Sequence, residues 1–543
     1  MRTRPSPRTR GPRRVHRIRG TSPRATARVT ATLLAAAALL VSACSPGNPA
    51  TSADGTTVQA ALAALPRATP EALTPYYGQR LRWRECGVPG FECATLKAPL
   101  DYASPDAGTV RLGVARKKAT GTAGRLGSLL VNPGGPGGSA VDYLQQYAGL
   151  GYPARIRARY DMVAMDPRGV ARSEPVKCLD GRQMDAYTQT DLTPDDQRER
   201  DALVAADRGF AESCGAHSAR LLRHVSTVEA ARDMDILRSV LGDRRLNYVG
   251  ASYGTFLGAT YAGLFPERVG RMVLDGAMDP SLDARRLNLD QTAGFETAFQ
   301  AFARDCVQRS DCPLGGRGAT PARVGDRLRA FFRELDARPL RSGDAGGRRL
   351  GEALATTGVI AAMYDEGTWA QLREALTSAI KERDGAGLLA LADTYYERDP
   401  DGHYSNLMMA NAAVNCLDLP SAFSGPEEVE KALPAFEKAS PVFGPGLAWA
   451  SLNCAYWPVR AKGEPHRIEA KGAAPIVVVG TVRDPATPYR WARSLAGQLS
   501  SAHLLTYAGD GHTAYGRGSG CIDTAIDTYL LQGTPPPPGK RCS

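Results

Sequence analysis

A glycine–x–serine–x–glycine pentapeptide between a strand and a helix is the feature that most constrains the fold of this chain. The apolar run 246–249 (LNYV) predicts a buried strand, and residues 256–265 predict an apolar helix. Between them lies GASYG at 250–254. The flanking glycines permit a strand-to-helix turn that larger side chains would prevent, so the hydroxyl of Ser252 is expected at the edge of a sheet. This context predicts a nucleophilic serine, and the alternative is a serine that merely begins a helix.

A serine nucleophile needs a base, and the chain has seven histidines. His512 lies in the glycine-rich loop 509–513 (GDGHT), directly after the last predicted strand. We predict that His512 is the base. The others fit less well, because they fall in the N-terminal leader, before the serine, in an inserted region or inside a strand: His16, His217, His224, His403, His466 and His503.

The acid that orients the histidine is expected beyond a late strand. Asp484 follows the apolar run 475–479 and precedes His512 by 28 residues. Asp275, after another apolar run, is the main competitor, and Asp510 is too close to His512 along the chain. The order Ser252, Asp484, His512 is that of α/β-hydrolases, in which the acid fixes the imidazole tautomer.

The loop VNPGGPGGS at 131–139 follows a predicted strand at 127–131. Hydrolysis through an acyl-enzyme needs backbone N–H donors for the oxyanion, one after the nucleophile and one from an early loop. Tyr253 is predicted to supply the first and Gly134 or Gly135 the second, with Gly134 preferred. The phosphate-binding alternative is weaker, because only a loose G-x-G-x-x-A can be read at 135–140 and no Walker motif is present.

Short apolar runs alternate with helical patterns, which predicts a mostly parallel central sheet with helices on both faces. The expected strands are residues 109–115, 127–131, 160–165, 246–249, 271–274, 475–479 and 502–507. The alternation of strands and helices is absent between residues 279 and 471, where long Ala/Leu/Arg-rich segments predict a large helical cap. The predicted organisation is a signal peptide (1–43), a flexible tether (44–75), a first core part (76–278), the cap (279–471) and a second core part (472–543).

The formal charge of +11 resides mainly in the leader. Residues 1–43 hold ten Arg and no acidic residue, which leaves 11 − 10 = +1 for the rest and argues against a nucleic-acid partner. An apolar run and VSAC at 41–44 follow the basic region, so we expect a signal peptide with lipidation at Cys44. The protein is then exported, either anchored to the outer face of the cytoplasmic membrane or secreted.

Ten cysteines remain after Cys44, and they form couples along the sequence. In an exported protein this predicts five local disulfides, although ten cysteines allow many connectivities. No C-x-x-C is present, so no metal site is expected. The predicted pairs are Cys86–Cys93, Cys178–Cys214, Cys306–Cys312, Cys416–Cys454 and Cys521–Cys542.

With these residues in place, the chain resembles prolyl aminopeptidases of the α/β-hydrolase family and, more closely, secreted actinobacterial tripeptidyl aminopeptidases and mycobacterial cell-envelope carboxylesterase or protease relatives. The resemblance rests on PGGPG (133–137), DPRG (166–169), GASYGT (250–255), VNCLD (414–418), RDPATP (483–488) and GHTAY (511–515). Prolyl aminopeptidases have His where Pro133 stands here, which favours the tripeptidyl branch. The resemblance implies that acidic cap residues hold the α-amino group of a peptide, and Asp418 is a candidate for this role.

The expected function is an aminopeptidase that releases short peptides from free N-termini of peptide or protein substrates, without a cofactor. A carboxylesterase or lipase with the same triad is the alternative, and a non-catalytic binding lipoprotein is a distant one. Membrane contact is expected only through the lipid at Cys44.

Overall fold

A computed structural model describes residues 59–121, 124–316 and 318–543. The predicted signal peptide and Cys44 lie outside these residues. The described residues all belong to one compact unit. Across the described part of the chain, no helix is both long and apolar enough to cross a bilayer.

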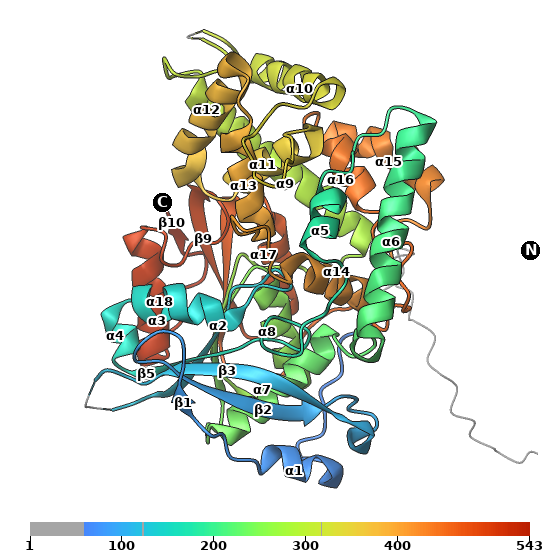
Figure 1. Ribbon diagram of the computed structural model, residues 1–543. Coiled ribbons are helices and arrows are strands. Elements are labelled where there is room, and N and C mark those ends of the chain that lie inside the picture. Colours follow the sequence, from blue (N-terminus) through green and yellow to red (C-terminus); the bar gives the residue numbers. More distant parts are fainter. Residues whose placement is uncertain (1–58, 122–123, 317) are drawn as a thin grey trace, which may run out of the picture. The chain divides into compact units, whose positions relative to one another are not determined.

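One ten-stranded sheet forms the centre of this unit, in the order β1-β2-β3-β5-β4-β6-β7-β8-β9-β10 (Figure 1). The first four strands in this order pair antiparallel, and all pairs from β5 to β10 are parallel. The prediction of a mostly parallel sheet is confirmed. The strands are β1 (Arg84–Glu85), β2 (Glu92–Pro99), β3 (Thr109–Lys117), β4 (Gly127–Asn132), β5 (Tyr160–Met165), β6 (Leu246–Ala251), β7 (Val269–Asp275), β8 (Ile476–Arg483), β9 (Ala502–Asp510) and β10 (Arg541–Cys542).

Both faces of the sheet are covered, which explains why its central strands read as continuous apolar runs. In β4, Leu130 packs with α7, α8 and α17, whereas Leu129 and Val131 pack with α2, α4 and α18 on the other face. The helices of the core are α1 (Thr74–Tyr77), α2 (Ala140–Tyr143), α3 (Gly149–Gly151), α4 (Ala154–Arg157), α7 (Thr227–Val240), α8 (Tyr253–Leu264), α17 (Tyr489–Gln498) and α18 (Gly520–Gln532).

The remaining helices form a cap from two insertions rather than one. The larger insertion lies between β7 and β8, and the smaller lies between β5 and α7. Leu203 of α6 is buried with Val429 of α15 and Trp449 of α16, so the smaller insertion packs against the larger one (Figure 1). The cap helices are α5 (Gly181–Thr188), α6 (Gln197–Leu222), α9 (Ala284–Cys306), α10 (Pro321–Ala337), α11 (Glu352–Met363), α12 (Trp369–Thr377), α13 (Ala386–Tyr396), α14 (Leu407–Asp418), α15 (Pro426–Ala439) and α16 (Gly444–Ala450).

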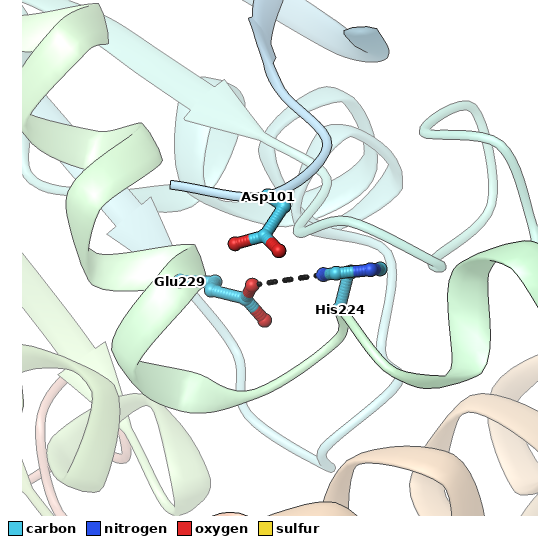
Figure 2. A group of neighbouring side chains, drawn as sticks. All are labelled: Asp101, His224 and Glu229. Atoms are coloured by element: carbon cyan, nitrogen blue, oxygen red, sulfur yellow. Dashed lines mark hydrogen bonds and ion pairs between the residues drawn. The ribbon is translucent and has the colours of Figure 1, made fainter. Parts of the chain in front are cut away.

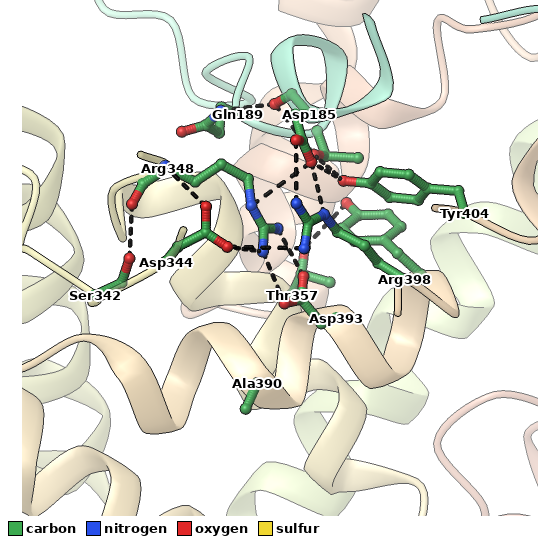
Figure 3. Close-up of polar contacts among 12 residues, drawn as sticks. Asp185, Gln189, Ser342, Asp344, Arg348, Thr357, Ala390, Asp393, Arg398 and Tyr404 are labelled. Atoms are coloured by element: carbon green, nitrogen blue, oxygen red, sulfur yellow. Dashed lines mark hydrogen bonds and ion pairs between the residues drawn. The ribbon is translucent and has the colours of Figure 1, made fainter. Parts of the chain in front are cut away.

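A buried ionic cluster also joins the two insertions (Figure 3). Asp185 of α5 accepts a hydrogen bond from Nε of Arg398 at 2.8 Å. Arg348 binds Asp344 and Asp393 at 2.9 and 2.6 Å, and the two arginine side chains are only 2% and 4% exposed. Two guanidinium groups therefore face three carboxylates, which compensates the charge that this contact buries.

The N-terminal boundary of the core differs from the predicted one. The N–H of Leu62 donates to the carbonyl of Arg467 at 2.8 Å, and that of Leu65 donates to Leu264 O at 2.9 Å. Leu73 is buried in the core. The tether predicted for residues 44–75 is therefore wrong for residues 59–75, whose apolar side chains and backbone groups find partners on the core.

Five disulfides join neighbouring cysteine couples. Two lie at the edges of the sheet. The other three lie in the cap, one in its smaller insertion and two in its larger insertion. The bonds are Cys86–Cys93, Cys178–Cys214, Cys306–Cys312, Cys416–Cys454 and Cys521–Cys542.

Arg168 of the DPRG turn is the most buried cation of the core. Its side chain and that of Asp233 are both 0% exposed, and the two form a bidentate pair with both N–O distances at 2.7 Å. The other guanidinium N–H groups donate to backbone carbonyls, among them that of His224.

Figure 2 shows His224 beside Glu229 and Asp101, with 3.3 Å between His224 Nδ1 and Glu229 Oε1. The guanidinium group of Arg168 lies 3.9 Å from the carboxylate of Glu229 and supplies positive charge next to this acidic pair.

We expect Arg168→Ala to lower the free energy of unfolding by about 3–5 kcal/mol, because it leaves a buried carboxylate without its partner. Arg220→Ala is the matched control, since the 2.9 Å pair of Arg220 with Glu174 is exposed and its loss costs about 1 kcal/mol or less. Denaturant unfolding of both variants measures this difference. Equal losses would contradict the structural role given to Arg168.

Candidate active site

Ser252 occupies the sharp turn between β6 and α8. Its backbone is at φ 56° and ψ −127°, a conformation that is strained for a residue with a side chain. Its N–H donates to the carbonyl of Asp275 at 2.9 Å, which holds the turn against β7. A Cβ at Gly250 would lie 2.4 Å from Gly254 O, so only glycine fits at the start of this turn. The sequence-predicted turn therefore exists, and its backbone is fixed from two sides.

Asp484 and His512 are in direct contact. His512 Nδ1 lies 2.9 Å from Asp484 Oδ1 and 3.1 Å from Oδ2. Because an ionised carboxylate only accepts, Nδ1–H is the donor and Nε2 is left as the basic nitrogen. Asp484 is 2% exposed and also accepts from the N–H groups of Ala486 and Thr487 at 3.0 and 2.8 Å. These bonds fix the carboxylate, and through it the imidazole.

The two competing acids make different contacts. Asp275 accepts from the N–H groups of Ala514 and Tyr515 at 3.0 and 2.8 Å, so it holds the loop after His512 rather than the imidazole. Burial raises the pKa of Asp275. Asp510 forms an ion pair with Arg483, with 2.6 Å between Arg483 Nε and Asp510 Oδ1. Of the three acids, only Asp484 hydrogen-bonds the His512 ring within the described residues.

Sequence reasoning missed two neighbours of His512. Thr487 places its hydroxyl 3.4 Å from Nδ1, and the RDPATP motif that contains it was a usable signal. Tyr364 follows α11, and its carbonyl accepts the His512 N–H at 2.8 Å while its ring packs edge-on against the imidazole. No local motif marks Tyr364, because its contact arises from the docking of the cap.

The glycine loop passes directly beside the serine turn. A Cβ at Gly134 would lie 2.5 Å from Ala251 O and 2.9 Å from Tyr253 N, so this close approach requires glycine. The Gly134 N–H, however, donates to the side chain of Asn132 at 2.9 Å. The preference for Gly134 as an oxyanion donor is therefore corrected. Gly135, which lines the cavity with Ser252, is the better candidate.

The second donor expected at the oxyanion is the Tyr253 N–H. Tyr253 is the first residue of α8, so its N–H has no acceptor within the helix. The helix dipole adds to the positive potential there.

A cap helix holds the outer side of the glycine loop. Asn411 of α14 donates from Nδ2 to the carbonyl of Pro136 at 3.1 Å, and Asn415 donates to Asn411 Oδ1 at 2.9 Å. The cap therefore contacts both the glycine loop, through α14, and the histidine loop, through Tyr364.

A cavity of about 320 Å³ lies between the core and the cap. It is lined by Ser252, Gly135 and Thr487 from the core and by Asn411 and Asp418 from the cap. Among the described residues, its lining contains two carboxylates, Asp418 and Asp279, and no Lys, Arg or His. The sequence candidate Asp418 thus reaches the same cavity as Ser252.

Asp418 is held against the core. Its carboxylate accepts from the N–H of Thr227 at 2.8 Å and from the Thr227 hydroxyl, which also contacts the hydroxyl of Tyr253. Burial raises the pKa of Asp418 to about 7. An ammonium group that entered the cavity would favour the ionised form of this carboxyl.

The arrangement is suited to nucleophilic catalysis. Nε2 of His512 is buried and has no hydrogen-bond partner among the described residues, so the structure joins Asp484 to His512 but shows no hydrogen bond between His512 and Ser252, and the lone pair of Nε2 remains free to accept a proton. Within the described ranges, three groups of acidic or histidine side chains lie close enough to share a cation, and none of them contains a residue of the cavity: Asp101/His224/Glu229, Asp191/Glu199/Asp336 and Asp195/Asp196/Glu199.

Comparisons with known proteins agree with this geometry. Residues 127–355 match the family described as alpha/beta hydrolase fold, and residues 440–542 match the family described as TAP-like protein. The chain is 38% identical to the serine protease Hip1 of Mycobacterium tuberculosis, over 86% of this chain and 92% of the relative. It is 39% identical to carboxylesterase B of the same species, over 83% and 86% of the two chains. It is 32% identical to the tripeptidyl aminopeptidase of Streptomyces coelicolor, over 83% and 84%.

The contacts of the two acids predict different effects of the same substitution. We expect Asp484→Asn to slow labelling of Ser252 by a fluorophosphonate about 10⁴-fold, because the amide stabilises the wrong imidazole tautomer. Asp275→Asn keeps an acceptor for the loop N–H groups and is expected to slow labelling by roughly tenfold at most. Rates of probe incorporation measure both effects, and the reverse ranking would show that Asp275 is the orienting acid.

Proposed function

Because the chain belongs to the α/β-hydrolase family of serine hydrolases, we propose that it is an exported aminopeptidase that releases short peptides, such as tripeptides, from free N-termini. The observation that carries this proposal is the charge of the cavity. Among the described residues, two carboxylates and no Lys or Arg side chain line the cavity that contains Ser252, which favours a substrate whose bound end is cationic. An unblocked peptide N-terminus has this property.

In the proposed reaction, Ser252 Oγ attacks the scissile carbonyl carbon while His512 Nε2 takes the hydroxyl proton. The N–H groups of Tyr253 and Gly135 donate to the oxyanion, and Asp484 stabilises the imidazolium. The tetrahedral intermediate collapses, the C–N bond breaks, and His512 gives its proton to the leaving amine. Water then attacks the acyl-serine by the same route and releases the short peptide.

Asp418 is the proposed partner of the substrate α-ammonium. It shares the cavity with Ser252, and its two bonds from Thr227 fix the direction of the carboxylate. Asp279, the other cavity acid, is only 4% exposed and accepts three hydrogen bonds, from the N–H and hydroxyl of Ser281 and from Gln498, whereas Asp418 is partly exposed and accepts two, both from Thr227. Asp418 is therefore the better placed acid for a ligand.

Carboxylesterase activity is the second candidate. It is supported by the 39% identity to carboxylesterase B and by a triad that does not distinguish an amide from an ester. The two carboxylates of the cavity favour the peptide, since an ester substrate has no need of a carboxylate partner.

Export through an N-terminal signal, with lipidation at Cys44, is part of the proposal. Five disulfides support an oxidising compartment. We expect a labelled fatty acid supplied to the producing cell to be incorporated into the protein and not into Cys44→Ser, and absence of label from the unchanged protein would argue against a lipid anchor.

We expect the enzyme to hydrolyse tripeptidyl p-nitroanilides with a free N-terminus and to lose this activity in Ser252→Ala. N-acetylation should lower kcat/KM about tenfold or more, because it removes a charge-assisted hydrogen bond worth about 1.5–3 kcal/mol. A panel of free and acetylated anilides beside p-nitrophenyl esters measures this. Equal rates on free and acetylated peptides, or hydrolysis of esters alone, would exclude an aminopeptidase.

The pKa of Asp418, about 7, also predicts a pH dependence. The ratio of kcat/KM for free over acetylated peptide should rise from pH 6 to about pH 7.5 as Asp418 ionises, and fall above the α-amino pKa of about 8 as the substrate loses its charge. Taking the ratio removes any pH dependence that the two substrates share. Asp418→Asn should abolish the rise, whereas Asp279→Asn, the matched control in the same cavity, should retain it.

A further inference from the structure

A second cavity of about 170 Å³ adjoins the one around Ser252, and we call it the side chamber. The two cavities have four lining residues in common and therefore adjoin at these residues: Gln291, Tyr395, Leu447 and Ala450. No residue of the proposed chemistry lines the side chamber. Its position suits a group that branches away from the reacting carbonyl.

The walls of the side chamber are mostly apolar and are contributed by α9, α11, α13, α14, α16 and nearby segments. Aromatic rings form a large part of them, and a flexible hydrocarbon chain can lie along such rings. The apolar lining residues are Leu192, Phe295, Ala353, Ile360, Tyr395, Tyr396, Met408, Val442, Phe443, Leu447 and Ala450.

In the part of the chain that the structure describes, Glu352 is the only charged residue that lines the side chamber. It is the first residue of α11, and burial together with the charges of Asp191 and Asp336 raises its pKa to about 7. The Thr193 side chain, as a hydrogen-bond donor, and the charge of the exposed Arg333 offset this increase only in part. Within the described residues, Asp191 Oδ2 is also buried without a hydrogen-bond partner. This end of the chamber therefore has an excess of negative charge.

We propose that the side chamber is a specificity pocket for a lysine or arginine side chain of the peptide that acylates Ser252, with Glu352 as the partner of its cationic end. The apolar walls cover the hydrocarbon stem, aromatic faces attract the cation, and the carboxylate forms a charge-assisted hydrogen bond with it. This inference rests on the proposed aminopeptidase function. It assigns Glu352 a ligand distinct from the α-ammonium given to Asp418.

The test uses free-N-terminal tripeptidyl anilides in which one position at a time carries Lys, norleucine or Glu. At one position the wild-type enzyme should prefer Lys over norleucine about tenfold or more in kcat/KM. Glu352→Gln should reduce this ratio to near one, and Glu352→Lys should favour Glu at the same position. Hydrolysis of p-nitrophenyl acetate, which is too small to need the chamber, should remain unchanged and verifies that each variant is folded.

A second variant tests the volume of the chamber. Thr356 lines it from α11, so Thr356→Phe should lower kcat/KM for Lys and norleucine substrates by a similar factor while p-nitrophenyl acetate hydrolysis is retained. Unchanged hydrolysis of both peptides would show that the chamber does not hold this side chain.

The outcomes separate the two proposals. If the wild-type enzyme prefers free N-termini but no position favours Lys, or if Glu352→Gln keeps the preference for Lys, the side-chamber assignment is wrong. If Glu352→Gln instead removes the preference for a free N-terminus, Glu352 binds the α-ammonium and the assignment is also wrong. If the wild-type enzyme cleaves no peptide, the aminopeptidase proposal fails, and the side-chamber proposal fails with it.

Discussion

Asp275 connects the two halves of the site. Its backbone carbonyl accepts the N–H of Ser252, and its carboxylate accepts the N–H groups of Ala514 and Tyr515 beyond His512. One residue at the end of β7 therefore fixes the serine turn on one side and the histidine loop on the other. The strained conformation of Ser252 persists because neighbouring strands and glycine contacts leave the turn no other arrangement.

The cap is attached to the same machinery. Tyr364 holds the N–H of His512, and Asn411 holds the carbonyl of Pro136 in the glycine loop. Cap helices therefore contribute contacts to the base and to the oxyanion loop, besides enclosing the cavity. The buried Arg348–Arg398 cluster ties the smaller insertion to this assembly. Substrate selection and the geometry of the reacting groups thus depend on one docked cap.

Much of this arrangement could be predicted from the sequence, because local patterns encode it. The alternation of apolar runs and helices predicted the sheet, and GASYG with GDGHT predicted the residues placed at the ends of β6 and β9. The long Ala/Leu/Arg-rich segments at 279–471 predicted most of the cap. Helices α5 and α6 were left in the core, since their amphipathic pattern does not reveal which surface they cover.

The errors have a common physical origin in contacts between residues distant in sequence. Gly134 was preferred as an oxyanion donor because the Asn132 side chain that occupies its N–H cannot be seen in a glycine-rich string. Residues 59–75 have the composition of a tether, yet their backbone pairs with Arg467 and Leu264. Glu352 acquires its position when α11 packs with the other cap helices, and Tyr364 when the cap reaches the loop of His512.

The central claim is that Ser252 removes short peptides from free N-termini. Mass spectrometry of the products from an unblocked decapeptide and its N-acetylated form tests this most directly. An aminopeptidase of this kind yields short N-terminal fragments from the unblocked peptide, leaves the acetylated one intact, and yields nothing when Ser252 is replaced by Ala. Internal cleavage of both peptides, or no cleavage by enzyme that hydrolyses esters, would contradict the claim.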